Sequence, residues 1–315
     1  MDPDSDEVVF DLPEHFRIYK SGRIDRFHRP VLVAAGVDGE ASGVATKDVV
    51  LDAATGLTVR LFLPKRQERP SGKKLPVLVF FHGGGFIIES AKSAMYHNYL
   101  TSLAAAAGVL GVSVDYRLAP EHRLPAAYDD CWTALQWAAS ARDDWLAEHG
   151  DASRVFVAGD SAGGNTVHNV LVRASSAENA ARIEGAVLLH PWFGGSTAIE
   201  GEPERAVVNT AKWWASACPD AADGADDPRI NPTAPGAPAL ERLGCERMLV
   251  CAAEKDWVAA ARDRAYYDAV AASAWPGSAA WLETEGEEHV FFLLKPECDR
   301  AKALMDRVVA FIAGA

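Results

Sequence analysis

The sequence from residue 75 onward alternates short apolar runs with longer stretches of helical periodicity, and this alternation limits the fold more than any other feature. The run Leu75–Phe81 is continuously apolar and ends in a glycine cluster, which is typical of a buried parallel strand. Further strands are predicted at Val109–Asp115, Arg154–Ala158, Ile183–Leu189, Arg247–Ala253 and Ala279–Glu283, and helices at Met95–Ala107, Ala126–Glu148, Ser161–Ala174, Ala259–Ser273 and Asp299–Ala313. Strands that alternate with helices form βαβ units, so we expect an α/β fold with a mostly parallel sheet covered on both faces.

Two parts of the chain depart from this alternation. The acidic start, Met1–Pro13, predicts a loose segment, and strand pairs are expected after it at Phe16–Tyr19 with Arg23–Phe27 and at Thr46–Leu51 with Leu57–Leu63. The stretch from His190 to Leu243 holds no clear strand and is too long for a plain connection. We therefore expect an insertion over one end of the sheet, with a helix around Val207–Ala217.

Charge and hydropathy exclude several classes of partner. The chain of 315 residues carries 31 Lys and Arg against 44 Asp and Glu, a net charge of −13. An acidic surface of this kind disfavours nucleic acid and anionic membranes. No apolar stretch approaches the roughly 20 residues of a membrane span. The length allows one large domain or two smaller ones.

The cysteines and the first residues predict a reducing compartment. Five cysteines are scattered without a C-x-x-C pair or any metal-type spacing, so we expect free thiols and no metal site. The first seven residues contain four acids and no base, which is unlike a secretory or transit segment. These features together predict a cytoplasmic protein.

The segment Gly159-Asp160-Ser161-Ala162-Gly163 matches G-x-S-x-G and lies between a predicted strand and a predicted helix. In that setting the serine occupies a strained turn that lifts its hydroxyl clear of the sheet. The glycines allow neighbouring backbone to pass closely. We therefore expect Ser161 to be a nucleophile.

A second motif, His82-Gly83-Gly84-Gly85, directly follows the apolar strand. Acyl transfer creates a tetrahedral oxyanion, which needs backbone N–H donors aimed at it. Glycines let these groups approach a substrate, and the residue after the nucleophile, Ala162, supplies a further N–H. A phosphate-binding loop is disfavoured, because neither G-K-[ST] nor G-x-G-x-x-G follows. His82 itself is expected to hold this loop by hydrogen bonding.

A serine nucleophile needs a base and an acid that orients the base. His289 is the only histidine after His190, so it is the expected base, and His190 is expected to be structural. Asp256 follows the strand Arg247–Ala253 and is the expected acid. Glu254 is the competing acid, and Asp263 ranks below it because it falls inside the next predicted helix.

These motifs resemble those of the hormone-sensitive-lipase-like α/β-hydrolases. The matching segments are Phe81–Phe86, Val114–His122 and Gly159–Asn165, and those similar to the plant carboxylesterase branch are Tyr19–Arg26, Glu254–Trp257 and His289–Phe291. The resemblance covers nearly the whole chain. It implies the α/β-hydrolase fold, Ser161, His289 and Asp256 as a catalytic triad, and Gly83, Gly84 and Ala162 as oxyanion donors.

The resemblance also implies a domain organisation. It makes residues 1–315 a single hydrolase domain, in which the N-terminal segment 1–45 and the insertion 194–240 together form a cap over the acyl pocket. No cofactor is expected. The partner implied is a small-molecule ester, and oligomeric state is not indicated.

The expected activity is hydrolysis of small to medium apolar carboxylic esters through an acyl-enzyme. The same branch contains 2-hydroxyisoflavanone dehydratases, tuliposide-converting enzymes that perform internal transesterification, and gibberellin receptors. A dehydratase or transesterase, or a receptor-like binding protein, are therefore the alternatives. The receptors have lost the catalytic histidine, and some dehydratases carry threonine for the serine, so His289 and Ser161 favour hydrolysis.

Overall fold

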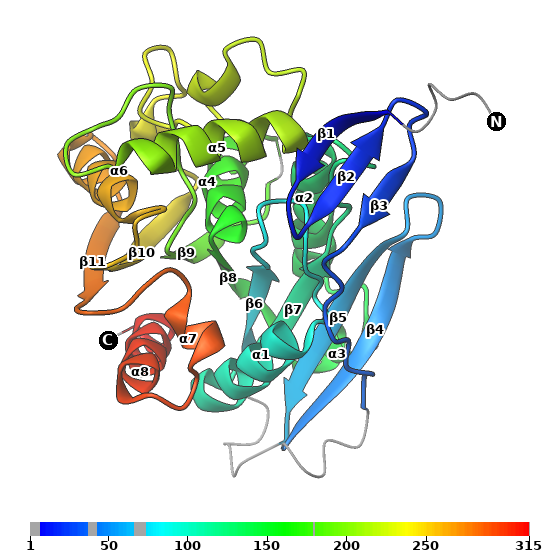
Figure 1. Cartoon of the computed structure of the whole chain (residues 1–315). Coiled ribbons are helices and arrows are strands. Elements are labelled where there is room, and N and C mark those ends of the chain that lie inside the picture. Colours follow the sequence, from blue (N-terminus) through cyan, green and yellow to red (C-terminus); the bar gives the residue numbers. More distant parts are fainter. Residues whose placement is uncertain (1–6, 37–42, 66–73, 179, 315) are drawn as a thin grey trace.

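The computed structural model describes residues 7–36, 43–65, 74–178 and 180–314. Its centre is an eight-stranded sheet in the order β11-β10-β9-β8-β6-β7-β5-β4 (Figure 1). The strands are β4 (Val44–Asp52), β5 (Leu57–Pro64), β6 (Leu75–Phe81), β7 (Leu110–Asp115), β8 (Gly150–Asp160), β9 (Ile183–Leu189), β10 (Cys245–Ala253) and β11 (Ser278–Thr284). The strands from β11 to β7 run parallel, and β5 is antiparallel to both of its neighbours. The expected mostly parallel sheet is confirmed.

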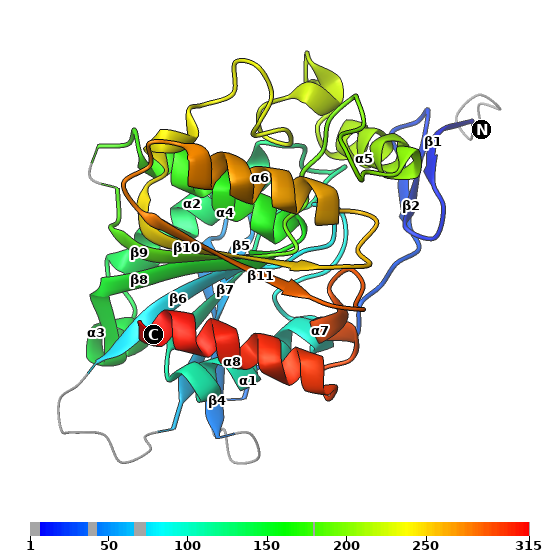
Figure 2. The same ribbon diagram turned by 90° about the vertical axis from the view of Figure 1, so that its left-hand side faces the viewer.

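Helices cover both faces of this sheet. They are α1 (Ala94–Ala107), α2 (Ala126–Ala139), α3 (Asp144–His149), α4 (Ala162–Ala174), α5 (Glu204–Ala217), α6 (Ala260–Ala272), α7 (Phe291–Leu294) and α8 (Asp299–Ala313). Figure 2 shows α2, α4 and α6 over one face and α1 and α8 over the other. The layers are those of an α/β fold with a doubly covered sheet.

The position of β6 between two layers of helices explains why its sequence is apolar throughout. Val79 and Phe81 belong to the hydrophobic cluster under α2, α4 and α6, whereas Leu78 and Phe80 belong to the cluster under α1 and α8. All four side chains are fully buried. A strand with helices on both faces buries both sets of alternating side chains, so an alternating polar pattern is absent.

A small second sheet lies beyond the carboxyl ends of the parallel strands, next to α5 (Figure 2). It is antiparallel and consists of β1 (Val8–Leu12), β2 (Phe16–Tyr19) and β3 (Ile24–Arg26). The rings of His15 and Trp213 meet edge to face at 5.0 Å, and the Lys212 ammonium lies 5.9 Å from the Phe10 ring centre. These contacts join the N-terminal segment to the insertion.

Two local expectations are corrected. The segment 1–13 is not loose throughout, since residues 8–12 form β1, where Phe10 stacks on Phe16 at 5.6 Å; residues 1–6 lie outside the described part of the chain. The helix expected over 126–148 is two helices, α2 and α3. The first ends at Ala139, and Asp143 begins the second, because its carboxylate accepts the Trp145 N–H at 2.8 Å and caps the new helix.

The segment 1–45, expected as part of a cap, includes residues of the main sheet. Residues 44 and 45 are paired in β4 of the main sheet, and residues 37–42 lie outside the described part. The contacts with α5 come from the sheet β1–β3 and its turn. Residues 194–240 contain α5 and a short 3₁₀ turn at residues 224–226, and no strand is present there.

Candidate active site

Ser161 occupies a sharp turn between β8 and α4. Its φ and ψ are 51° and −118°, an uncommon conformation for a residue with a side chain. A Cβ on Gly163 would lie 1.9 Å from the carbonyl oxygen of Phe81, and one on Gly159 would lie 2.4 Å from the carbonyl oxygen of Gly163. Only glycine fits at both positions, so the motif has the strand–turn–helix context that its spacing predicts.

The structure brings the three expected side chains together from three strand ends. Nε2 of His289 lies 3.0 Å from Oγ of Ser161, and Nδ1 lies 2.6 Å from Oδ2 of Asp256. A carboxylate can only accept, so Asp256 holds the proton on Nδ1 and leaves Nε2 to accept from the serine hydroxyl. This is the geometry that a nucleophile, a base and an orienting acid require.

Asp256 is held as a carboxylate by its surroundings. Its side chain is fully buried, and its Oδ1 accepts the N–H groups of Val258 at 2.9 Å and Ala259 at 3.1 Å. Burial acts to raise the pKa of Asp256, but the nearby His289 ring and these hydrogen bonds outweigh it and lower the pKa. Asp256 is therefore charged at neutral pH and can stabilise an imidazolium.

The two competing acids lie elsewhere. The exposed carboxylate of Glu254 accepts the Gly286 N–H at 2.7 Å, so it supports the loop before His289 and does not contact the ring. Asp263 is fully buried in α6, and neither of its oxygens has a hydrogen-bond partner within the described residues. Burial, together with the charge of Asp256, raises the pKa of Asp263 well above its ordinary value.

The hydrogen bonds of the glycine loop after β6 correct the role expected of Gly83 as an oxyanion donor. The N–H of Gly83 lies 2.8 Å from Oη of Tyr96 and 3.0 Å from Oδ1 of Asp160, so it is already used. No hydrogen bond in the described part of the chain takes the N–H of Gly84 or Gly85. The first turn of α4 leaves the N–H of Ala162 free as well. Gly83 thus anchors the loop, and Gly84, Gly85 and Ala162 carry the available donors.

His82 has the structural place that was expected. Its ring is fully buried, stacks on Tyr116 with centroids 4.1 Å apart, and bonds through Nδ1 to the carbonyl oxygen of Gly83 at 2.8 Å. Oη of Tyr116 donates to the carbonyl oxygen of His82 at 2.6 Å. These contacts fix the start of the glycine loop.

Trp213 of the insertion packs directly on this loop. A Cβ on Gly85 would lie 2.4 Å from the Trp213 ring, so the indole covers the backbone there. Its neighbour Trp214 is buried instead and meets Trp192 at 6.4 Å. The two adjacent indoles therefore have different surroundings, and Trp213 is the one that borders the oxyanion loop.

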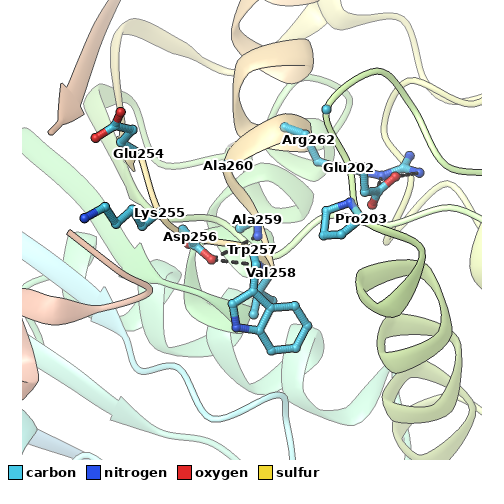
Figure 3. Close-up of a pocket in the computed structure, with 12 residues that line it drawn as sticks. Glu202, Pro203, Glu254, Lys255, Asp256, Trp257, Val258, Ala259, Ala260 and Arg262 are labelled. Carbon is cyan, nitrogen blue, oxygen red and sulfur yellow. Dashed lines mark hydrogen bonds and ion pairs between the residues drawn. The ribbon is translucent and has the colours of Figure 1, made fainter. Parts of the chain in front are cut away.

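A cavity of about 410 Å³ lies beside the acid of the triad (Figure 3). It is lined by residues 201–203 of the insertion and by residues 254–262. Arg262 is buried at its side and pairs with the buried Glu202 at 2.7 Å. Two further bonds join the Arg262 guanidinium to the carbonyl oxygens of Gly194 and Thr197, at 2.9 and 2.7 Å. Arg262 therefore fastens the insertion to α6.

His190, which was expected to be structural, lies next to the site. Its ring centre lies 6.0 Å from that of His289, and its Nδ1 accepts the Val290 N–H at 2.9 Å. One nitrogen of His190, one of His289 and one oxygen of Asp256 lie within 4.8 Å of one another. Asp256 and His289 are already hydrogen-bonded to each other, so we assign this cluster to the triad and not to a metal. The sequence signal that could have placed His190 near the site is its position at the carboxyl end of a predicted parallel strand.

The fold and this site define an enzyme of the α/β-hydrolase type. A family profile described as alpha/beta hydrolase fold matches residues 78–293, which is more than half of the chain. The chain therefore belongs to the α/β-hydrolase fold family, and the resemblance seen in the motifs is confirmed.

Similar proteins come from plants and from microbial esterases. A tuliposide A-converting enzyme of Tulipa gesneriana, b1, is 48% identical over 314 residues, covering 98% of this chain and 81% of the enzyme. A 2-hydroxyisoflavanone dehydratase of Glycyrrhiza echinata is 41% identical over 323 residues, covering 98% of this chain and 97% of the dehydratase. The crystal structure of EstE1, a thermostable carboxylesterase from a metagenomic library, has a TM-score of 0.67 at 25% identity and covers 90% of each chain.

These relatives overturn the expected compartment. The tulip enzymes are named amyloplastic or chloroplastic, which contradicts a cytoplasmic location. The expectation rested on the scattered cysteines and the acidic first residues, whereas a compartment is set by a receptor-read address that the folded domain does not need. Within the described residues no helix is long and apolar enough to cross a membrane.

Proposed function

We propose that this protein is a serine carboxylesterase that hydrolyses small to medium apolar carboxylic esters. The hydrogen-bonded series from Ser161 through His289 to Asp256 is the observation that supports this most. The named esterase activity of similar structures, at 25–26% identity, agrees with it. The partner in this proposal is a small-molecule ester.

The first half-reaction forms an acyl-enzyme. Oγ of Ser161 attacks the ester carbonyl while Nε2 of His289 takes the hydroxyl proton, and Asp256 stabilises the imidazolium that results. The N–H groups of Gly84, Gly85 and Ala162 are the donors for the oxyanion. The tetrahedral intermediate then collapses, the ester C–O bond breaks, and the alcohol leaves with the proton from His289.

The second half-reaction returns the enzyme to its starting state. His289 takes a proton from water, the hydroxide attacks the acyl carbonyl, and the acid leaves as Ser161 recovers its proton. We also propose that β1–β3 and the insertion act as a cap in one hydrolase domain. Trp213 would then form an apolar wall next to the oxyanion loop.

Burst kinetics test this assignment. With excess p-nitrophenyl butyrate, we expect a burst of p-nitrophenol equal to the enzyme concentration, followed by slower turnover. Ser161→Ala should abolish both phases and labelling by a fluorophosphonate. Ser176→Ala, which changes an exposed serine beyond α4, is the control. Activity that survives in Ser161→Ala would refute the proposal.

A second candidate is conversion without hydrolysis, by transesterification or dehydration on the same residues. A relative at 41% identity is named a dehydratase and one at 48% identity a converting enzyme, and these names are the reason to test it. Reactions in ¹⁸O-labelled water separate the two, because hydrolysis places one labelled oxygen in the released acid. A lactone, or another product without the label, would favour the second candidate.

A further inference from the structure

His190 is packed next to His289, the proposed catalytic base. It follows β9 and is fully buried, with a φ of 48°. Its backbone N–H donates to the carbonyl oxygen of Cys251 at 2.7 Å. Its ring stacks on Phe291 at 5.7 Å and meets Phe292 edge to face at 5.5 Å. The imidazole therefore has little freedom to reorient.

The hydrogen bond to Val290 defines what this ring does. A backbone N–H can only donate, so Nδ1 of His190 accepts and its proton lies on Nε2. Burial, together with the charge of His289, lowers the pKa of His190 to about 3. The ring is therefore neutral at neutral pH and is a permanent acceptor. Its Nε2 is buried and has no hydrogen-bond partner within the described residues.

Val290 needs such an acceptor. Its φ is 47°, an uncommon and strained value for a β-branched residue. This strained residue directly follows His289. Before the base, the loop is held by the Lys255 N–H on the carbonyl oxygen of Glu287 at 2.8 Å. After the base, His190 supplies the side-chain acceptor that holds the backbone.

We infer that His190 is a positioning residue for the proposed reaction: by accepting the Val290 N–H, it holds His289 where one ring nitrogen meets Ser161 and the other meets Asp256. The inference rests on the proposed function, because His190 acts only through the base. The loss of this bond leaves the half-buried Val290 N–H without its acceptor and lets the loop relax out of its strained turn. A shift of about 1 Å at a catalytic group can cost roughly 100-fold in rate.

Two substitutions separate the hydrogen bond from the packing. His190→Phe keeps an aromatic ring and removes the acceptor. His190→Asn loses the ring, and its Oδ1 can take the place of Nδ1. We expect His190→Phe to lower kcat by about 10- to 100-fold with KM changed by no more than about 2-fold, and His190→Asn to stay within about 5-fold of the wild-type kcat.

The matched control is His168→Phe. His168 is also fully buried, and its Nδ1 bonds to Oη of Tyr266 at 3.0 Å, inside the helical layer over the sheet. This variant should lower the melting temperature and leave kcat near the wild-type value. The inference is overturned if His190→Phe keeps the wild-type kcat, or if His190→Asn loses as much as His190→Phe.

Hydrogen exchange at the Val290 amide gives a readout that does not depend on turnover. We expect protection in the wild type and in His190→Asn, and faster exchange in His190→Phe. Rapid exchange of this amide in the wild type would overturn the inference even if His190→Phe did not fold. A wild-type protein that neither turns over esters nor reacts with a fluorophosphonate would instead refute the proposed function, and the amide would still report on the bond.

Discussion

The buried carboxyl group of Asp160 accepts the backbone N–H of Gly83 at 3.0 Å. Its second oxygen accepts the hydroxyl of Tyr96 at 2.8 Å. Because Asp160 directly precedes Ser161, these bonds tie the glycine loop after β6 to the turn that carries the nucleophile. A Cβ on Gly83 would lie 2.4 Å from Oδ2 of Asp160, so glycine is required at this junction.

Asp160 should make the stability of the protein depend on pH. Burial raises its pKa from 3.8 to about 7 in the folded state. Between these values the unfolded chain is ionised and the folded protein is not, so unfolding releases a proton and stability falls as pH rises. We expect wild-type stability to fall relative to Asp160→Asn, which does not titrate, by up to about 1.4 kcal/mol per pH unit.

Urea denaturation of both proteins from pH 4 to pH 8 measures this difference. The two curves should diverge up to about pH 7 and then run parallel, because Asp160 is ionised in both states above that pH. A constant difference over the whole range would show that burial does not perturb this carboxyl group.

Substitution of the two competing acids should have opposite outcomes. Asp256→Asn removes the carboxylate that holds the proton on Nδ1 of His289, so we expect kcat to fall by about 10³- to 10⁴-fold. Glu254→Gln keeps an oxygen for the Gly286 N–H, and kcat should stay within about 3-fold of the wild type. Steady-state kinetics with p-nitrophenyl butyrate measure kcat for both variants. Equal losses of kcat in the two would contradict the assignment of Asp256 as the orienting acid.

Trp213 should limit which esters the site accepts. Its indole covers the backbone at Gly85, so Trp213→Ala opens space beside the oxyanion loop. We expect preference to shift toward longer acyl chains, by about 10-fold in the ratio of kcat/KM for octanoate over acetate. The half-buried Trp132 of α2 packs under Arg173 of α4, and Trp132→Ala should leave this ratio unchanged. An unchanged ratio in Trp213→Ala would remove it from the acyl pocket.

Two arginines of the same helix should differ strongly in their effect on stability. Arg262→Met leaves Glu202 buried without its partner and frees the insertion from α6, so we expect a loss of about 3–5 kcal/mol. Arg264 pairs with Asp268 at the surface, and Arg264→Met should leave the urea midpoint close to the wild-type value, because solvent screens an exposed ion pair. Urea denaturation measures both. The double variant Arg262→Met with Glu202→Leu should recover part of the loss, and no recovery would argue against a buried uncompensated charge.

Local patterns predicted most of the fold. β6 and β9 have the bounds that their apolar runs indicate, and α8 begins and ends as its periodicity predicts. The stretch 126–148 is one helix by periodicity alone, but α2 ends at Ala139 and the capping bond of Asp143 begins a separate helix. β1 was missed because its pairing with β2 and the stacking of Phe10 on Phe16 are not visible in an acidic stretch read by itself.

The amino-acid sequence by itself predicted the order of the strands in the main sheet and of the long helices, the strand–turn–helix setting of Ser161, and His289 as the candidate base. Periodicity and glycine turns act over a few residues, so they can be recognised along the chain. Only the tertiary structure decided that Gly83 is an anchor instead of an oxyanion donor, and that His190 holds the backbone at Val290. Their partners lie 77 and 100 residues away in sequence, and only the packed sheet brings them within 3 Å of each other.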